Sequence, residues 1–108
     1  MPNFLIQVAY NQEAWSALVK SPQNRIEAVR PAIERLNGKI VNGYFAFGEY
    51  DVVVITEFPD SVSAAAIAMA FAAGGACKAV KTTPLLTTAE ALDAMKKAST
   101  TGYRAATA

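Results

Sequence analysis

Histidine is absent from this 108-residue chain, and cysteine occurs only once, as Cys77. A chain without histidine has no Ser-His-Asp triad, no histidine-ligated metal site and no haem held by a proximal histidine. A single cysteine excludes an internal disulfide and any zinc or iron–sulfur site built from several cysteines. Cys77 is expected to behave as a small apolar side chain. We therefore expect neither a metal nor a cofactor.

Charge is also sparse, because only 18% of the residues are Asp, Glu, Lys or Arg, and the ten basic residues nearly cancel the nine acidic ones. Nucleic-acid binding usually needs a clustered basic surface, and disorder needs low hydrophobicity, whereas 53% of this chain is hydrophobic. The most apolar stretch, 62–73, is too short to span a bilayer, and no basic segment precedes an apolar one at the N-terminus. The sequence favours a cytoplasmic protein with no nucleic-acid or membrane partner.

The most informative stretch is 42–59, with the sequence NGYFAFGEYDVVVITEFP. Gly48-Glu49 predicts a two-residue type II′ turn, because the first position of that turn needs a positive φ, which glycine adopts freely. Strands over 39–47 and 50–58 are expected on either side of the turn. In this register Phe47 and Tyr50 form a cross-strand aromatic pair.

Strand and helix patterns alternate over the first part of the chain. The first strand is predicted over 4–10, where Phe4, Ile6, Val8 and Tyr10 point one way and Leu5, Gln7 and Ala9 the other. A short helix over 14–19 is expected to end near Ser21-Pro22, where Ser21 caps a second helix that has Pro22 at its first position. Asn37-Gly38 is expected to end this second helix, since both residues tolerate left-handed φ.

The last part of the chain predicts two more helices with a strand between them. An Asp-capped helix over 61–73 is apolar all round, and such a helix is normally buried. The strand covers 76–83 and is expected to end at Pro84. Thr87 with Glu90 forms a capping box that opens a last short helix.

This order of elements predicts an α+β fold, namely a ferredoxin-like βαββαβ antiparallel sheet with the helices on one face. We expect one domain over 1–98, followed by a tail of small residues over 99–108. The first strand is expected to lie between the third and the fourth, and antiparallel to both.

The two strands of the hairpin carry apolar residues on both faces. In the third strand, Val52 and Val54 point one way and Val53 and Ile55 the other. Helices on one side cover only one face of an antiparallel sheet, so the second face needs another cover. A second copy of the same sheet is the simplest one. We therefore expect a homodimer or a higher even-numbered homo-oligomer.

Several segments give the chain a resemblance to a known family. They are FLIQ at 4–7, GK at 38–39, YFAFGEYDVVVI at 44–55, PD at 59–60 and VKTTPLLT at 80–87. Together they resemble the GYD domain proteins, although Gly48-Glu49-Tyr50-Asp51 is one residue longer than a literal Gly-Tyr-Asp. The resemblance implies a dimeric α/β-barrel fold, shared with small monooxygenases, isomerases and regulator effector domains, and implies no particular activity.

Asp51 and Tyr50 are the candidate catalytic residues, because a carboxylate at the rim of an apolar cavity acts as a general base when desolvation raises its pKa. The structural alternative, in which Asp51 accepts hydrogen bonds from its own hairpin or pairs with a lysine, is favoured about three to one. Lys81 is a further candidate. The topology places it at the opposite end of the sheet from Asp51, which ranks it below Tyr50 and Asp51.

A ligand-binding surface is the other possibility. Tyr44, Phe47 and Tyr50 are suited to stack on a flat ligand, although aromatic residues on strands more often belong to a core or an interface. Gln7 is the one polar side chain within the first strand, and if it faces inward it needs a hydrogen bond from a ligand, a water or the partner sheet. Lys81 completes the set of candidate ligand-binding residues.

Two classes of function fit the sequence. The first is a non-catalytic oligomeric module that binds a small apolar or aromatic molecule, or that has a structural or regulatory role. The alternative is a cofactor-independent oxygenase or isomerase that acts on a small acidic or aromatic substrate through Asp51, Tyr50 and Lys81. A deep pocket where these three residues meet favours the enzyme, and a filled, dry interface favours the module.

Overall fold

The structure is a computed structural model that describes residues 1–106 of the chain. In chain order its elements are β1 (Asn3–Tyr10), α1 (Gln12–Lys20), α2 (Arg25–Arg35), β2 (Lys39–Phe45), β3 (Val52–Glu57), α3 (Ser61–Ala73), β4 (Cys77–Leu85) and α4 (Thr88–Ala98).

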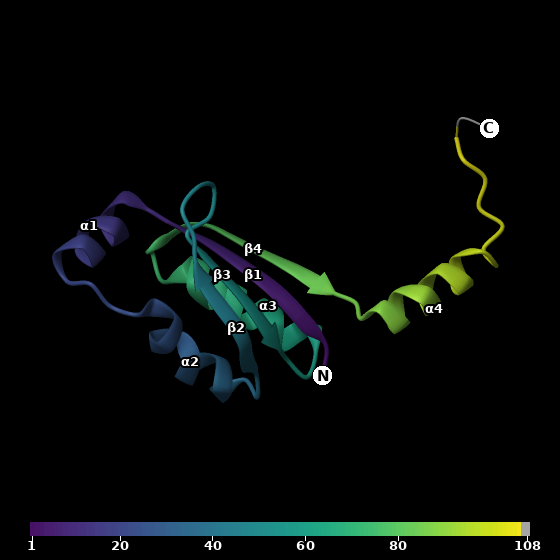
Figure 1. Cartoon of the computed structure of the whole chain (residues 1–108), viewed down its shortest axis with the longest axis horizontal. Coiled ribbons are helices and arrows are strands. Elements are labelled where there is room, and N and C mark those ends of the chain that lie inside the picture. Colours follow the sequence, from purple (N-terminus) through teal and green to yellow (C-terminus); the bar gives the residue numbers. More distant parts are fainter. Residues whose placement is uncertain (107–108) are drawn as a thin grey trace.

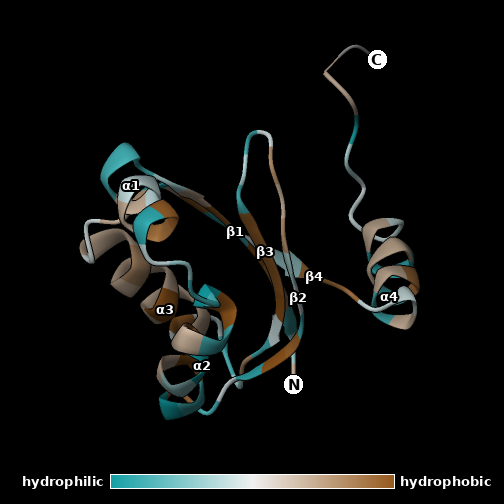
Figure 2. Ribbon diagram, turned by 60° about the vertical axis from the view of Figure 1, so that its left-hand side comes forward, coloured by the Kyte–Doolittle hydropathy of each residue, from teal (hydrophilic) through white to brown (hydrophobic). Residues whose placement is uncertain are grey.

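The four strands form one antiparallel sheet in the order β2-β3-β1-β4. This is the strand order of a ferredoxin-like domain, with the first strand between the third and the fourth as expected. Helices α1, α2 and α3 lie on one side of the sheet, and within residues 1–106 no helix packs against its other side (Figures 1 and 2). The predicted α+β, ferredoxin-like fold is confirmed.

The core lies between the sheet and these helices. Every second residue of β1 and β3 points into it, because side chains alternate between the two faces of a strand. Phe4 and Phe58 meet edge to face there, with their ring centroids 6.2 Å apart. The buried apolar residues of the core are Phe4, Ile6, Val8, Tyr10, Ile33, Ile40, Val52, Val54, Phe58, Ala64 and Ile67.

The hairpin has the predicted register but a longer loop. Phe45 pairs with Val52, as a turn centred on Gly48-Glu49 requires, yet both strands stop there and 46–51 form the loop. Gly48 has a φ of +150°, a region that favours glycine. The prediction of a tight two-residue turn with Phe47 packed on Tyr50 is wrong, because the Phe47 side chain is fully exposed.

Two further boundaries differ from the prediction. Helix α2 begins at Arg25 and not at Pro22, because the Asn24 side chain accepts hydrogen bonds from the N–H groups of Ile26 and Glu27 and so acts as the cap. Strand β4 continues through Pro84 to Leu85. A proline is tolerated there because β4 is an edge strand, and in the described part of the chain no strand on its outer side needs an N–H from it.

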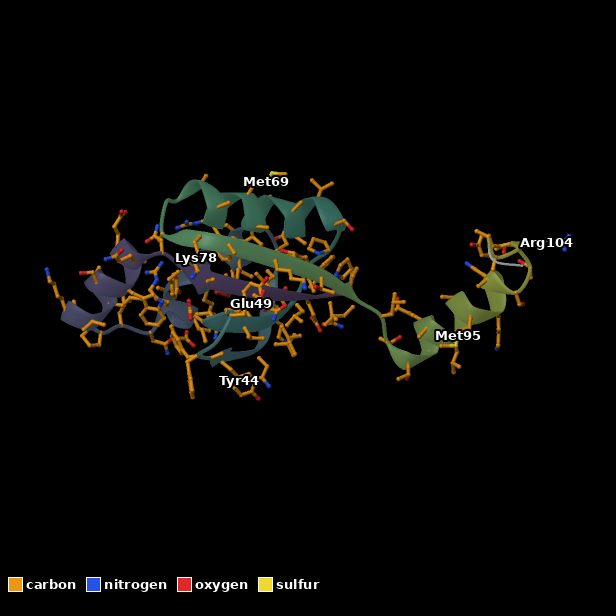
Figure 3. The ribbon with its side chains drawn as sticks, turned by 90° about the horizontal axis from the view of Figure 1, so that it is seen from above. Tyr44, Glu49, Met69, Lys78, Met95 and Arg104 are labelled. Atoms are coloured by element: carbon orange, nitrogen blue, oxygen red, sulfur yellow. The ribbon has the colours of Figure 1, made fainter. Side chains whose placement is uncertain are left out.

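The last two helices begin where the sequence predicts. Asp60 caps α3, and Thr87 and Glu90 form a capping box at α4. The expectation that the apolar α3 is buried holds only for its inner side, since Ala64 and Ile67 are buried while Met69 is exposed (Figure 3). Helix α4 buries none of its residues and extends away from the body as an arm (Figure 1).

Candidate functional site

A cavity of about 200 Å³ lies between the sheet and helices α2 and α3. Most of its wall is apolar and comes from strands, helices and the α3–β4 loop. The lining residues are Val8, Tyr10, Arg25, Ile26, Val29, Val52, Val54, Ala70, Phe71, Gly74, Ala76 and Cys77.

Tyr10 enters this cavity from the last position of β1. The register between β1 and β4 shifts between Ala9 and Tyr10, and an irregularity of this kind re-aims a side chain. The Tyr10 ring packs edge-on against Trp15 of α1, with the centroids 5.7 Å apart and the planes at 89°. The contact with Trp15 of α1 therefore holds the Tyr10 ring in place.

Arg25 stands at the first position of α2, on the cavity wall. Burial raises the pKa of the Tyr10 hydroxyl, and the nearby Arg25 guanidinium partly opposes this rise in pKa. Burial likewise raises the pKa of the Cys77 thiol, again with Arg25 acting in the other direction. The cavity thus combines an apolar body with one cation, a protonated phenol and a protonated thiol.

Asp51, the candidate base, is buried against the end of β1. Its Oδ2 accepts a hydrogen bond from the Tyr10 backbone N–H at 2.9 Å and lies 3.3 Å from the Trp15 indole N–H. Its own backbone N–H donates to the Val8 carbonyl oxygen at 2.8 Å. These contacts tie the hairpin to β1 and α1. The donors to Asp51 are thus Tyr10 and Trp15, and not the hairpin or a lysine that the structural alternative named.

Gln7 and Lys81 are brought together on the face of the sheet opposite the helices. Gln7 pairs in register with Val53 on one side and Lys81 on the other, and Val53 pairs in turn with Tyr44. Because Ile6 and Val8 are buried on the helix side, this row of four residues faces outward. Lys81 therefore lies halfway along the edge strand β4, and the expectation that it lies at the far end of the sheet from Asp51 is wrong.

The aromatic candidates are spread along the hairpin. Tyr44 is exposed at the β2 edge and points away from the fold (Figure 3), where its hydroxyl accepts a hydrogen bond from the Asn42 side chain at 3.1 Å. It also borders a second, more polar groove of about 480 Å³ between α2 and β2. Phe47 is at the hairpin tip, and Tyr50 is half-buried in the loop.

Neither of these two cavities is lined by Gln7, Tyr50, Asp51 or Lys81. Their part in ligand binding stays a prediction. Sequence reasoning missed Tyr10 and Arg25, which do line the first cavity. The sequence held one signal for this site. A cation at the start of a helix is disfavoured by the helix dipole, so Arg25 at that position suggests a functional role. That signal depends on Asn24 being the helix cap.

Among residues 1–106, no three side chains of His, Cys, Asp or Glu lie together in a way that holds a metal ion. No helix in the same range is long and apolar enough to cross a membrane.

The fold and the uncovered sheet face define a small α+β domain of the ferredoxin-like type. The family model of the GYD domain matches residues 4–95, and the chain belongs to this family. Among solved structures, the chain is similar to the crystal structure of MtbAldR, with a TM-score of 0.57 and 17% identity over 80% of this chain and 53% of that one. It spans about half of that chain, and the likeness shows the fold alone. No curated protein matches the sequence.

Proposed function

We propose that this chain is one protomer of a homo-oligomeric, non-catalytic module that binds a small molecule. The uncovered sheet face is the observation that carries the oligomer, and two such faces packed together form an α/β barrel. The apolar cavity on the helix side supports the binding function, since small-molecule sites are concave, mostly apolar and equipped with a few polar groups.

The uncovered face has an apolar centre. Leu5 of β1 pairs with Ile55 of β3 and with Thr83 of β4, and Val53 lies beside this group in the next row. All of these side chains are only half-buried in a single chain. An apolar surface on this scale marks an interaction site, because monomers rarely leave such patches in water.

The small size of the sheet face indicates that other elements also contribute to the interface between protomers. Four strands at ~4.8 Å spacing and six residues at ~3.3 Å give about 400 Å² in projection, whereas a stable interface buries roughly 800 Å² on each partner. The missing contact is available in α4. This 11-residue helix buries nothing within its own chain, and isolated helices of that length are marginal in water.

Helix α4 also has the composition of an interface element. Leu92 and Met95 lie one turn apart on one side and are both exposed, whereas Lys97 projects from the opposite side. Met95 stands clear of the body (Figure 3), and α4 lies beyond the sheet face that the other helices leave open (Figure 2). Packing of this arm on a second copy supplies the tertiary contacts that it lacks.

Light scattering at micromolar concentration tests the oligomer, and we expect a mass that is an even multiple of 11.4 kDa. Val53→Glu buries a charge in the proposed interface and should give monomer or insoluble protein. The matched control is Val19→Glu, which places the same charge on the exposed side of α1 and should leave the mass unchanged. A stable wild-type monomer would reject the proposal.

Ligand retention is tested separately. Native mass spectrometry of protein that has not been denatured reports the number of subunits and any co-purified molecule in one spectrum. A bound molecule of low mass, released when the protein unfolds, is the expected result.

A further inference from the structure

The cavity on the helix side contains a cation, Arg25, without an ion-pair partner in a mostly apolar wall. Within the described residues the only ion pair joins Arg30 to Glu27, at 2.9 Å, so the acid nearest to Arg25 on its own helix already has a partner. The Arg25 guanidinium donates to the Gln23 side-chain oxygen at 3.0 Å, which is a neutral contact. A carboxylate in the cavity would give Arg25 its missing counter-charge.

The position of Arg25 strengthens this argument. It is the first residue of an 11-residue helix, where the partial positive charge of the helix N-terminus disfavours a second cation. An anion beside Arg25 is attracted by both charges. A guanidinium binds a carboxylate through two parallel N–H donors, so the geometry of the ligand group is also specified.

Tyr10 supplies the second polar contact. Tyr10 and Arg25 line the same cavity; burial raises the pKa of the Tyr10 hydroxyl, and Arg25 is near enough to oppose part of this rise. The protonated phenol can donate to a carboxylate oxygen. Apart from the Cys77 thiol, the remaining side chains of the wall, including Val29 and Phe71, offer apolar contact to the body of the ligand.

We infer that this cavity binds a small carboxylic acid with an apolar or aromatic body, held by Arg25 and Tyr10. A volume of 200 Å³ corresponds to roughly seven waters of liquid volume, which suits an acid of about that many non-hydrogen atoms or slightly more. The inference rests on the proposed binding function and names its ligand class. It does not require the oligomer, because every lining residue comes from one chain.

Trp15 is the only tryptophan and touches the Tyr10 ring, so its fluorescence reports on the cavity. The wild-type protein is titrated with benzoate and with 4-methylpentanoate, and in parallel with the two corresponding amides. We expect a saturable change with both acids. The amides, which have the same shape without the charge, should bind at least about tenfold more weakly.

Variants then assign the charge to its residue. Arg25→Gln should weaken binding of the acids at least about tenfold and weaken binding of the amides much less, since the amides lose a neutral hydrogen bond and no charge pair. Arg25→Lys keeps the charge without the two-pronged geometry and should fall in between. Arg35→Gln, at the other end of the same helix and outside the cavity, is the matched control and should bind like wild type.

The outcomes separate the ligand class from the binding function. Equal affinity for acids and amides, or unchanged acid binding by Arg25→Gln, overturns the carboxylate assignment and leaves a module for neutral ligands. No saturable change with any of the four compounds at about 10 mM overturns the cavity as a ligand site altogether.

Discussion

Two threonine hydroxyls face the same core with different hydrogen bonding. Thr56 of β3 is fully buried, and its hydroxyl donates to the Phe4 carbonyl oxygen at 3.1 Å. The Thr82 hydroxyl of β4 is buried too, and within residues 1–106 it has no hydrogen-bond partner. A buried hydroxyl without a partner loses its hydration and gains nothing in return.

The two threonines should therefore respond in opposite ways to the same substitution. Thr82→Val removes an unsatisfied group and is expected to increase the free energy of unfolding by about 1 kcal/mol. Thr56→Val removes a satisfied hydrogen bond and should decrease the free energy of unfolding by about 1–2 kcal/mol, because the Phe4 carbonyl loses its donor. Urea unfolding of both variants measures the difference. Equal losses of stability in the two variants would contradict it.

Asp51 gives a second prediction at the scale of one residue. Asp51→Ala leaves the Tyr10 N–H buried without an acceptor and should destabilise by about 2–3 kcal/mol. Asp51→Asn keeps an oxygen that can accept from both Tyr10 and Trp15, so its loss should be about 1 kcal/mol or less. Thermal unfolding checks both values. If Asp51→Asn keeps its stability and yet loses a bound ligand, Asp51 belongs to a binding or catalytic site instead.

Local sequence rules predicted the starts of two helices correctly. Asp60, Thr87 and Glu90 act as helix caps because capping depends on groups within three positions along the chain. The start of α2 was predicted wrongly, at Ser21 with Pro22, whereas Asn24 is the cap. Tyr10 and Arg25 could not be paired from sequence, because they share a cavity wall only once β1 and α2 have packed.

At the scale of elements, strand ends were predicted less well than strand positions. The hairpin register is right because Gly48 fixes the centre of the turn, yet the strands end at Phe45 and Val52. Whether the hydrogen-bonded pairing of β2 and β3 continues past that pair depends on what packs against the tip of the hairpin. Nothing in the described chain covers Phe47 there. Similarly, Pro84 stays within β4 only because the tertiary fold makes β4 an edge strand.

Helix α4 provides a pH-dependent prediction for a single element. The hydrogen bond from the Thr87 backbone N–H lowers the pKa of Glu90, so the folded helix favours the ionised carboxylate. A lowered pKa stabilises the helix above the ordinary glutamate value, and this stabilisation is lost as the pH falls through the lowered pKa. We expect α4 to fray on acidification below about pH 4.

Amide NMR signals of α4 recorded from pH 6 to pH 3 would show this fraying. The matched variant is Glu90→Gln, which keeps a side-chain acceptor for the Thr87 N–H without a titrating group. Its α4 signals should change much less with pH. A wild-type helix that keeps its signals throughout the range would show that contacts other than the capping box hold α4 in place.

At the scale of the whole molecule, the fold followed from the order of the elements, and the site did not. Two-sided apolar strands indicated correctly that the helices leave one face of the sheet bare. The cavity is lined from β1, α2, β3, α3 and the start of β4, so its lining residues are scattered between Val8 and Cys77. No single stretch of the sequence contains such a site, and its residues come together only when the elements pack.

The extended arm leads to the last prediction. If α4 packs on a second copy, removal of 87–108 should raise the dissociation constant of the oligomer at least about tenfold, since buried Leu and Met side chains each contribute ~1.5–3 kcal/mol. The body should still fold, because α4 contributes no buried residue to it. Near-ultraviolet circular dichroism of Trp15 checks that fold, and sedimentation over a dilution series measures the dissociation constant.

Two point variants of α4 provide a finer test. Met95→Gln should also weaken the oligomer, whereas Lys97→Gln, on the opposite side of α4, should have no effect. If Met95→Gln and Lys97→Gln dissociate alike and like wild type, the arm lies outside the interface and the sheet face alone joins the protomers.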